Sequence, residues 1–179
     1  MDTNTAHEEH PLHDKRARLA LPMDRDLRDR APEVVGSLIA LLQAPGDIDL
    51  AAIEIALQTL PVTEESLGDA IHHDDANYVR TLLYRDARCE VLALTWLNGQ
   101  RSPLHDHGAS DCIMRIVSGA ATENLYRERE AGAAKREHMT RTLRAGTVAL
   151  TRADTMHSIA NDGGERLVTL HVYTPPLGC

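Results

Sequence analysis

The sequence predicts a mainly β protein, with an antiparallel, jelly-roll-like β-barrel that follows N-terminal α-helices. Two observations carry this prediction. After residue 77 the chain divides into short apolar or alternating segments, many of them separated by Gly, Asn and Asp pairs. Before residue 77, three segments have apolar residues at helical spacing and are separated by Pro and Gly.

The length of 179 residues is enough for a single domain. We expect this domain to cover residues 14–179, with a helical part at 14–76 and the barrel at 77–179. Residues 1–13 are polar and are interpreted as a flexible tail. The tail contains three histidines, His7, His10 and His13. A weak adventitious metal site is the alternative interpretation of these histidines.

Three helices are predicted within the helical part. The first begins near Pro32, which suits a first helical turn, and the Pro45-Gly46 pair ends it. The second begins after Asp47, a suitable N-cap, and ends before Pro61. The third is short and runs from residue 63 to about residue 73.

Eight strands are predicted in the barrel, each four to eight residues long. Their ranges are 79–83, 90–97, 112–117, 122–126, 139–143, 147–151, 157–160 and 167–173. The chain has no Phe, one Trp and four Tyr, so aliphatic side chains must fill most of the core. With so few aromatic residues, each tyrosine can be considered individually for a role.

Charge and cysteine content narrow the partners and the compartment. The net charge of −8 argues against nucleic acid and anionic membrane surfaces, which select for clustered Lys and Arg. Neither a signal-peptide pattern nor a membrane-spanning apolar stretch is evident. Three scattered cysteines do not suggest a disulfide framework, so we expect a cytoplasmic protein. We expect it to be a monomer or a weak oligomer.

Two stretches combine histidine and glycine at regular spacing. They read Gly99-x5-His105-x-His107-x4-Cys112-x6-Gly119 and Gly146-x10-His157-x3-Asn161. Alternate residues of a strand point to one face, so His105 and His107 are expected to aim two imidazoles at one point. His157, on a later strand, can complete a three-nitrogen site. Imidazole suits Fe, Zn, Cu and Ni, and three protein ligands leave positions open for chemistry.

Other histidines have no comparable spacing. His72, His73 and His138 are interpreted as structural. A lone His-x-His pair in a strand is itself often a surface or core pair. The glycine spacing and the later His157 and Asn161 favour a metal site instead.

The two motifs resemble those of the cupin superfamily, over residues 99–119 and 146–161. In many cupins an acidic residue follows the histidine pair as a fourth ligand, and here that position is Cys112. In the second motif, Arg152 and Asp154 stand where Pro and Gly are usual. The change at Cys112 matters most, because three neutral histidines leave a bound Fe(II) ion with its full positive charge. Such an ion favours a thiolate partner.

Flanking residues resemble a narrower group, the cysteine dioxygenase family (type I, bacterial-like) of thiol dioxygenases. The resemblance covers residues 75–177 and rests on Tyr78-Val-Arg80, Ser102-Pro-Leu-His105-Asp-His107 and Leu170-His171-Val-Tyr173-Thr-Pro-Pro176. It implies Fe(II) held by His105, His107 and His157. It also implies oxidation of L-cysteine by O2 to cysteine sulfinic acid, with the substrate thiolate and amine on the iron.

The resemblance also implies substrate-binding residues. Arg80 matches the arginine that binds the substrate carboxylate, which a planar guanidinium can hold through two hydrogen bonds. Tyr78, two residues earlier, matches a tyrosine that positions this arginine. Thr169 is placed with them because it shares an inward strand face with His171 and Tyr173. The alternatives are a surface salt bridge for Arg80, barrel packing for Tyr78 and core filling for Thr169.

Catalytic roles follow from the same resemblance. Tyr173 matches the tyrosine whose hydroxyl reaches the bound substrate and oxygen, and His171 would orient that hydroxyl. Cys112 matches the position that forms a thioether crosslink to this tyrosine in some members of the family. A Cys112–Tyr173 crosslink is therefore a hypothesis, and a small buried hydrophobe is the alternative for Cys112. Polar residues inside a barrel are costly unless they have partners or a function.

Three other functions remain open from the sequence. A 3-mercaptopropionate dioxygenase is the nearest, although glutamine tends to replace the carboxylate-binding arginine in that group, so Arg80 favours cysteine. A non-catalytic metal-binding cupin is the second, since one fold hosts many functions. A cupin isomerase, or a zinc or nickel enzyme, is the third.

Overall fold

The structure is a computed structural model that describes residues 31–127 and 136–178. The expected tail at 1–13 lies outside the described residues. Three helices come first along the chain, and their bounds are α1 Gly36–Gln43, α2 Leu50–Thr59 and α3 Glu64–Leu67. A short 3-10 helix, Glu33–Val35, leads into α1. No helix in these ranges is long and apolar enough to cross a membrane.

Two helix ends differ from the sequence prediction. Asp49, and not Asp47, caps α2, because its carboxylate accepts a hydrogen bond of 2.9 Å from the backbone N–H of Ala51. The third helix is shorter than predicted. Gly68 has a φ of 52°, which interrupts α3, and the chain continues only as a 3-10 turn to Ala70.

All eight predicted strands are present. They are β1 Val79–Arg85, β2 Glu90–Trp96, β3 Asp111–Ser118, β4 Ala120–Arg127, β5 Arg136–Arg144, β6 Val148–Thr151, β7 Met156–Ala160 and β8 Leu167–Thr174. Tight turns join several of them. At Gly119, between β3 and β4, φ is 76° and a Cβ atom would lie 2.4 Å from the carbonyl oxygen of Arg166. This motif glycine is therefore required by the turn.

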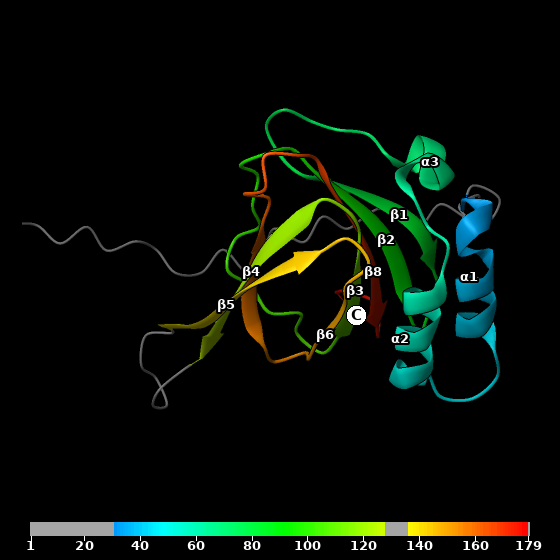
Figure 1. The fold of residues 1–179 in the computed structure, drawn as a ribbon. Coiled ribbons are helices and arrows are strands. Elements are labelled where there is room, and N and C mark those ends of the chain that lie inside the picture. Colours follow the sequence, from blue (N-terminus) through cyan, green and yellow to red (C-terminus); the bar gives the residue numbers. More distant parts are fainter. Residues whose placement is uncertain (1–30, 128–135, 179) are drawn as a thin grey trace, which may run out of the picture.

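The strands form two antiparallel sheets that face each other as a barrel. The five-stranded sheet has the order β1-β2-β8-β3-β6, and the three-stranded sheet has the order β5-β4-β7. Figure 1 shows the helices on one side of the barrel and β4 and β5 on the other. The predicted mainly β, antiparallel barrel with N-terminal helices is confirmed.

Each face of the five-stranded sheet has its own core. The outer face packs against the helices through Leu38, Leu57, Val91, Ile113 and Val172. The inner face packs against the three-stranded sheet through Leu92, Trp96, Met114, Leu143 and Ile159. Buried polar side chains also lie on strands of the barrel: Glu90, Glu123, Thr151, His157, Thr169 and His171. A barrel interior with this many polar groups needs partners for them, and these groups lead to the candidate site.

Candidate metal centre

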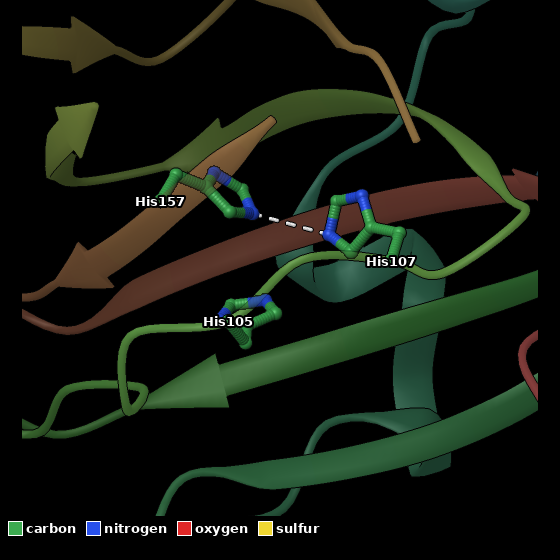
Figure 2. Close-up of side chains that lie close together, drawn as sticks. All are labelled: His105, His107 and His157. Carbon is green, nitrogen blue, oxygen red and sulfur yellow. Dashed lines mark hydrogen bonds between the residues drawn. The ribbon is translucent and has the colours of Figure 1, made fainter. Parts of the chain in front are cut away.

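The three motif histidines come together at the barrel interior. His105 and His107 lie in the loop between β2 and β3, and His157 lies on β7. One ligand nitrogen from each ring lies within 4.8 Å of the others. Figure 2 shows the three rings converging, with Nε2 of His107 3.1 Å from Nε2 of His157. In the described residues this is the one such group of three His, Cys, Asp or Glu side chains.

The local backbone differs from the strand that the alternation argument assumed. His105 forms only an isolated bridge with His157, whose two main-chain hydrogen bonds both measure 2.9 Å. His107 donates its backbone N–H to the carbonyl of Ala153 at 3.2 Å, just before a turn at Gly108. The two rings thus converge because the loop is pinned to β7 and to the turn before it.

Hydrogen bonds at the far side of two rings set their tautomers. Nδ1 of His105 lies 2.9 Å from the carbonyl oxygen of Pro103, which can only accept. Nδ1 of His157 lies 2.9 Å from a carboxylate oxygen of Glu123. Both Nδ1 atoms are therefore assigned the ring proton, and each Nε2 keeps its lone pair. Nδ1 of His107 is buried and has no hydrogen-bond partner among the described residues.

The electrostatics keep the rings of His105 and His107 neutral. Burial, followed by the neighbouring rings of His157 and His105, lowers the pKa of His107 to about 3. Burial also lowers the pKa of His105. Neutral imidazole is the form that binds metals. The 3.1 Å between two Nε2 atoms fits adjacent ligands about 2.1 Å from one ion, which would lie roughly 3 Å apart. The donor set therefore fits a transition-metal ion.

The carboxylate that lies behind His157 was not predicted from the sequence as part of the site. Glu123 on β4 is fully buried and also accepts a 2.6 Å hydrogen bond from Nε of Arg141 on β5. Burial alone would raise the pKa of Glu123, but hydrogen bonds from His157 and Arg141 outweigh it and the pKa is lowered. The available signal was a glutamate at an inward position of the predicted strand 122–126, between the apolar Ala121 and Leu125.

A row of polar side chains on β8 faces the same interior. Nε2 of His171 lies 2.8 Å from the hydroxyl of Thr169, and Nδ1 of His171 lies 3.3 Å from the hydroxyl of Tyr173. The indole N–H of Trp96 donates to the Thr169 hydroxyl at 3.2 Å. The inward row predicted from the sequence is thus a connected chain of contacts. Trp96, which the sequence did not single out, stands at its start.

Cys112 lies beside this row. It is the register partner of Tyr173 across β3 and β8, and its Sγ is 3.6 Å from Nδ1 of His171. Burial raises the pKa of Cys112 to about 12 and, with Cys112 next, raises the pKa of Tyr173 well above its usual value. Both groups are therefore protonated at neutral pH.

Arg80 lies on β1 of the five-stranded sheet, and Tyr78 directly precedes that strand. Arg80 pairs with Leu94 on β2, and its side chain is exposed. Its positive charge nevertheless reaches the interior, because burial and then Arg80 hold the pKa of His171 well below its usual value. Tyr78 stacks on Trp96 with ring centroids 4.1 Å apart. Tyr78 thus packs against the same Trp96 side chain whose indole N–H donates to the Thr169 hydroxyl.

Other sequence candidates lie apart from this cluster. His72, His73 and His138 do not belong to the three-histidine group. Cys89 and Cys112 are free thiols, and Cys179 lies outside the described residues, as do His7, His10 and His13.

Comparison with known proteins places this site in a family. The model of the family described as cysteine dioxygenase type I matches residues 56–179. The chain belongs to the cysteine dioxygenase type I family. The protein named cysteine dioxygenase type 1 of Rattus norvegicus is 24% identical over 155 residues, covering 81% of this chain and 76% of the rat protein. The Homo sapiens protein of that name is 23% identical over 154 residues, with the same coverage.

Solved structures agree on the fold. A cupin superfamily protein from Desulfitobacterium hafniense DCB-2 has a TM-score of 0.50 and 18% identity, covering 64% of this chain and 89% of that protein. A protein with a double-stranded beta-helix domain from Klebsiella pneumoniae has a TM-score of 0.51 and 19% identity, covering 60% and 80%. The barrel is therefore a cupin fold. Membership of the cysteine dioxygenase family implies a small-molecule substrate and O2.

The buried neutral His171 predicts a pH dependence of stability. Its pKa is lower in the folded than in the unfolded chain, so the unfolded chain binds more protons below about pH 6.5. The contribution of His171 to the free energy of unfolding is fully present above that pH. It is lost as the pH falls, by up to about 1.4 kcal/mol per pH unit. Urea unfolding of metal-free wild type and His171→Gln at pH 7 and 5.5 should show a smaller loss in the variant. Equal losses in the two proteins would contradict this assignment.

Proposed function

We propose that this protein is an Fe(II)-dependent cysteine dioxygenase that oxidises L-cysteine with O2 to cysteine sulfinic acid. The observation that carries the proposal is a site of three histidines with no carboxylate among its ligands, in a chain of this family. The reaction balances without a further reductant, since the electrons lost by the substrate sulfur are those gained by dioxygen, and both oxygen atoms end on sulfur.

Three residues would hold the iron: His105, His107 and His157. Bound there, Fe(II) supplies open coordination positions at which a thiol and dioxygen meet, and the redox chemistry that joins them. Neutral imidazoles leave the charge of the ion unreduced, which favours an anionic thiolate over the thiol. The apolar inner face around the site, including Leu92, Leu94 and Met114, keeps bulk water away from the reacting groups.

Arg80 would orient the substrate. The Arg80 guanidinium would bind the carboxylate of cysteine through charge-assisted hydrogen bonds. No hydrogen bond or ion pair occupies the Arg80 side chain within the described residues, so its donors are available. Tyr78, held by its stack on Trp96, would limit where the arginine can lie.

The β8 row would direct a proton toward the substrate. The Thr169 hydroxyl already accepts from Trp96, so its own O–H is best placed to donate a hydrogen bond to Nε2 of His171. That choice leaves the ring proton of His171 on Nδ1, facing the Tyr173 hydroxyl. Tyr173 then accepts from His171 and keeps its own proton to donate to charge that develops on oxygen.

The first of three predictions from this proposal concerns the substrate. Iron-loaded protein should consume O2 with cysteine and form the sulfinic acid, with lower kcat/KM for 3-mercaptopropionate and cysteamine. An oxygen electrode and product analysis across the three thiols measure this. A strong preference for 3-mercaptopropionate would move the assignment to the related dioxygenase. Metal binding without O2 uptake with any small thiol would support a non-catalytic cupin.

The second prediction separates Arg80 from the rest of the site. Arg80→Ala should raise the KM for cysteine by about 30-fold, or about 2 kcal/mol, through loss of a charge-assisted carboxylate pair. Cysteamine has no carboxylate, so its KM should change little and it serves as the matched control. If the KM for cysteine is unchanged, or if both thiols are affected equally, Arg80 does not bind the carboxylate.

The third prediction concerns Cys112. We propose that Cys112 and Tyr173 form a thioether, in which the S–H bond and one ring C–H bond break, Sγ bonds to the ring, and the two hydrogens with their electrons reduce dioxygen to hydrogen peroxide. Iron held by the three histidines would supply the redox chemistry. Their register pairing across β3 and β8 supports this. Intact-mass analysis after turnover should show the loss of two hydrogens in wild type and its absence in Cys112→Gly. An active wild-type enzyme with the full mass would contradict the crosslink.

A further inference from the structure

The negative charge that many cupins place among the metal ligands is present in this chain at another position. Cys112 replaces that acidic ligand, yet Glu123 on β4 lies directly behind His157. In the register of the three-stranded sheet, Glu123 is paired with Arg141 on β5 and with Ile159 on β7. His157 is two residues from Ile159, so the carboxylate and the imidazole meet diagonally across β4 and β7.

The carboxylate of Glu123 has its two shortest hydrogen bonds with His157 and Arg141, and the Thr151 hydroxyl donates to Oε1 at 3.5 Å. Oε1 lies 2.9 Å from Nδ1 of His157, and Oε2 lies 2.6 Å from Nε of Arg141. Glu123 has no exposed surface, whereas the Arg141 side chain is 36% exposed. Solvent screens the half-exposed arginine more than it screens the buried imidazole. The negative charge of Glu123 therefore acts more strongly on His157 than on Arg141.

We propose that Glu123 is a positioning residue that supplies the metal site with negative charge through His157, and that Arg141 sets how much of that charge the site receives. This inference rests on the proposed metal site. Hydrogen bonding from Nδ1 to a carboxylate fixes the ring with Nε2 toward the metal and makes that nitrogen a stronger donor. A stronger donor tightens binding of a divalent ion and stabilises the ferric over the ferrous state. Arg141 opposes both effects by drawing charge away from His157.

Packing alone gives no reason for an ionised group at this position. Ala121 and Leu125, the neighbours of Glu123 on the same face of β4, are buried and apolar. An apolar residue at position 123 would fill the same space without the desolvation penalty of a buried charge. The retained carboxylate is therefore explained by what it does to His157.

The experiment compares Glu123→Gln and Arg141→Met with wild type in two measurements. Zn²⁺ affinity of the metal-free proteins is measured against a chelator, and the Fe(III)/Fe(II) midpoint potential is measured on the iron-loaded proteins. Glu123→Gln should bind Zn²⁺ about 10–100-fold more weakly, the range typical for loss of such a partner, and its midpoint potential should rise. Arg141→Met should bind Zn²⁺ somewhat more tightly than wild type, and its midpoint potential should fall.

Two matched controls report nonspecific effects. Asn124→Ala alters the next residue of β4, whose side chain accepts from Thr140, and Arg101→Met removes an exposed guanidinium paired with Asp162. Neither should move affinity or potential. Unchanged Zn²⁺ affinity in Glu123→Gln, or a shift of the potential in the same direction for both test variants, overturns the inference while the metal site stands. If Glu123→Gln does not fold, the sign for Arg141→Met decides. Failure of wild type to bind Zn²⁺ or Fe(II) overturns both proposals.

Discussion

Two main-chain hydrogen bonds between His105 and His157 join the loop after β2 to the strand β7, and the site depends on this join. The two residues belong to different motifs and are far apart in the sequence. Their backbone pairing fixes the distance between two imidazoles before any ion is bound. His107 lies two residues further along the same loop. Its backbone N–H donates a hydrogen bond to the carbonyl of Ala153. A preformed site of this kind avoids the entropy of ordering its ligands at the time of binding.

The interior of the barrel carries polar groups in connected sets, which is how a low-dielectric core tolerates them. One set runs from Arg141 through Glu123 to His157 and ends at the three-histidine site. The other runs from Trp96 through Thr169 to His171, Tyr173 and Cys112. The first set lies on the three-stranded sheet and the second mainly on the five-stranded sheet. In the proposed function, the two sheets would therefore contribute different roles to the barrel interior, metal binding from the three-stranded sheet and proton direction from the five-stranded sheet.

Much of the fold was predictable, because turn residues and alternation mark strands locally. All eight strands and all three helices were predicted. The differences lie at the ends of elements: Asp49 and Gly68 set helix ends through local geometry, and β4 and β5 are longer than predicted. The convergence of the three histidines was also predicted. That prediction assumed the alternation of side chains along a strand, whereas His105 and His107 lie in the loop between β2 and β3. Glu123 and Trp96 were not predicted as site residues. Their roles depend on cross-strand register, which a sequence does not specify when the pairing of distant strands is unknown.

In the proposed function, the three histidines hold an iron ion to which a thiol substrate binds through sulfur. X-ray absorption at the iron edge of the loaded protein tests this most directly, with and without cysteine in the absence of O2. Only nitrogen and oxygen neighbours are expected without substrate, and a sulfur neighbour at about 2.3 Å is expected once cysteine is added, a length typical of metal–thiolate bonds. An iron environment that gains no sulfur at saturating cysteine would contradict the proposed function.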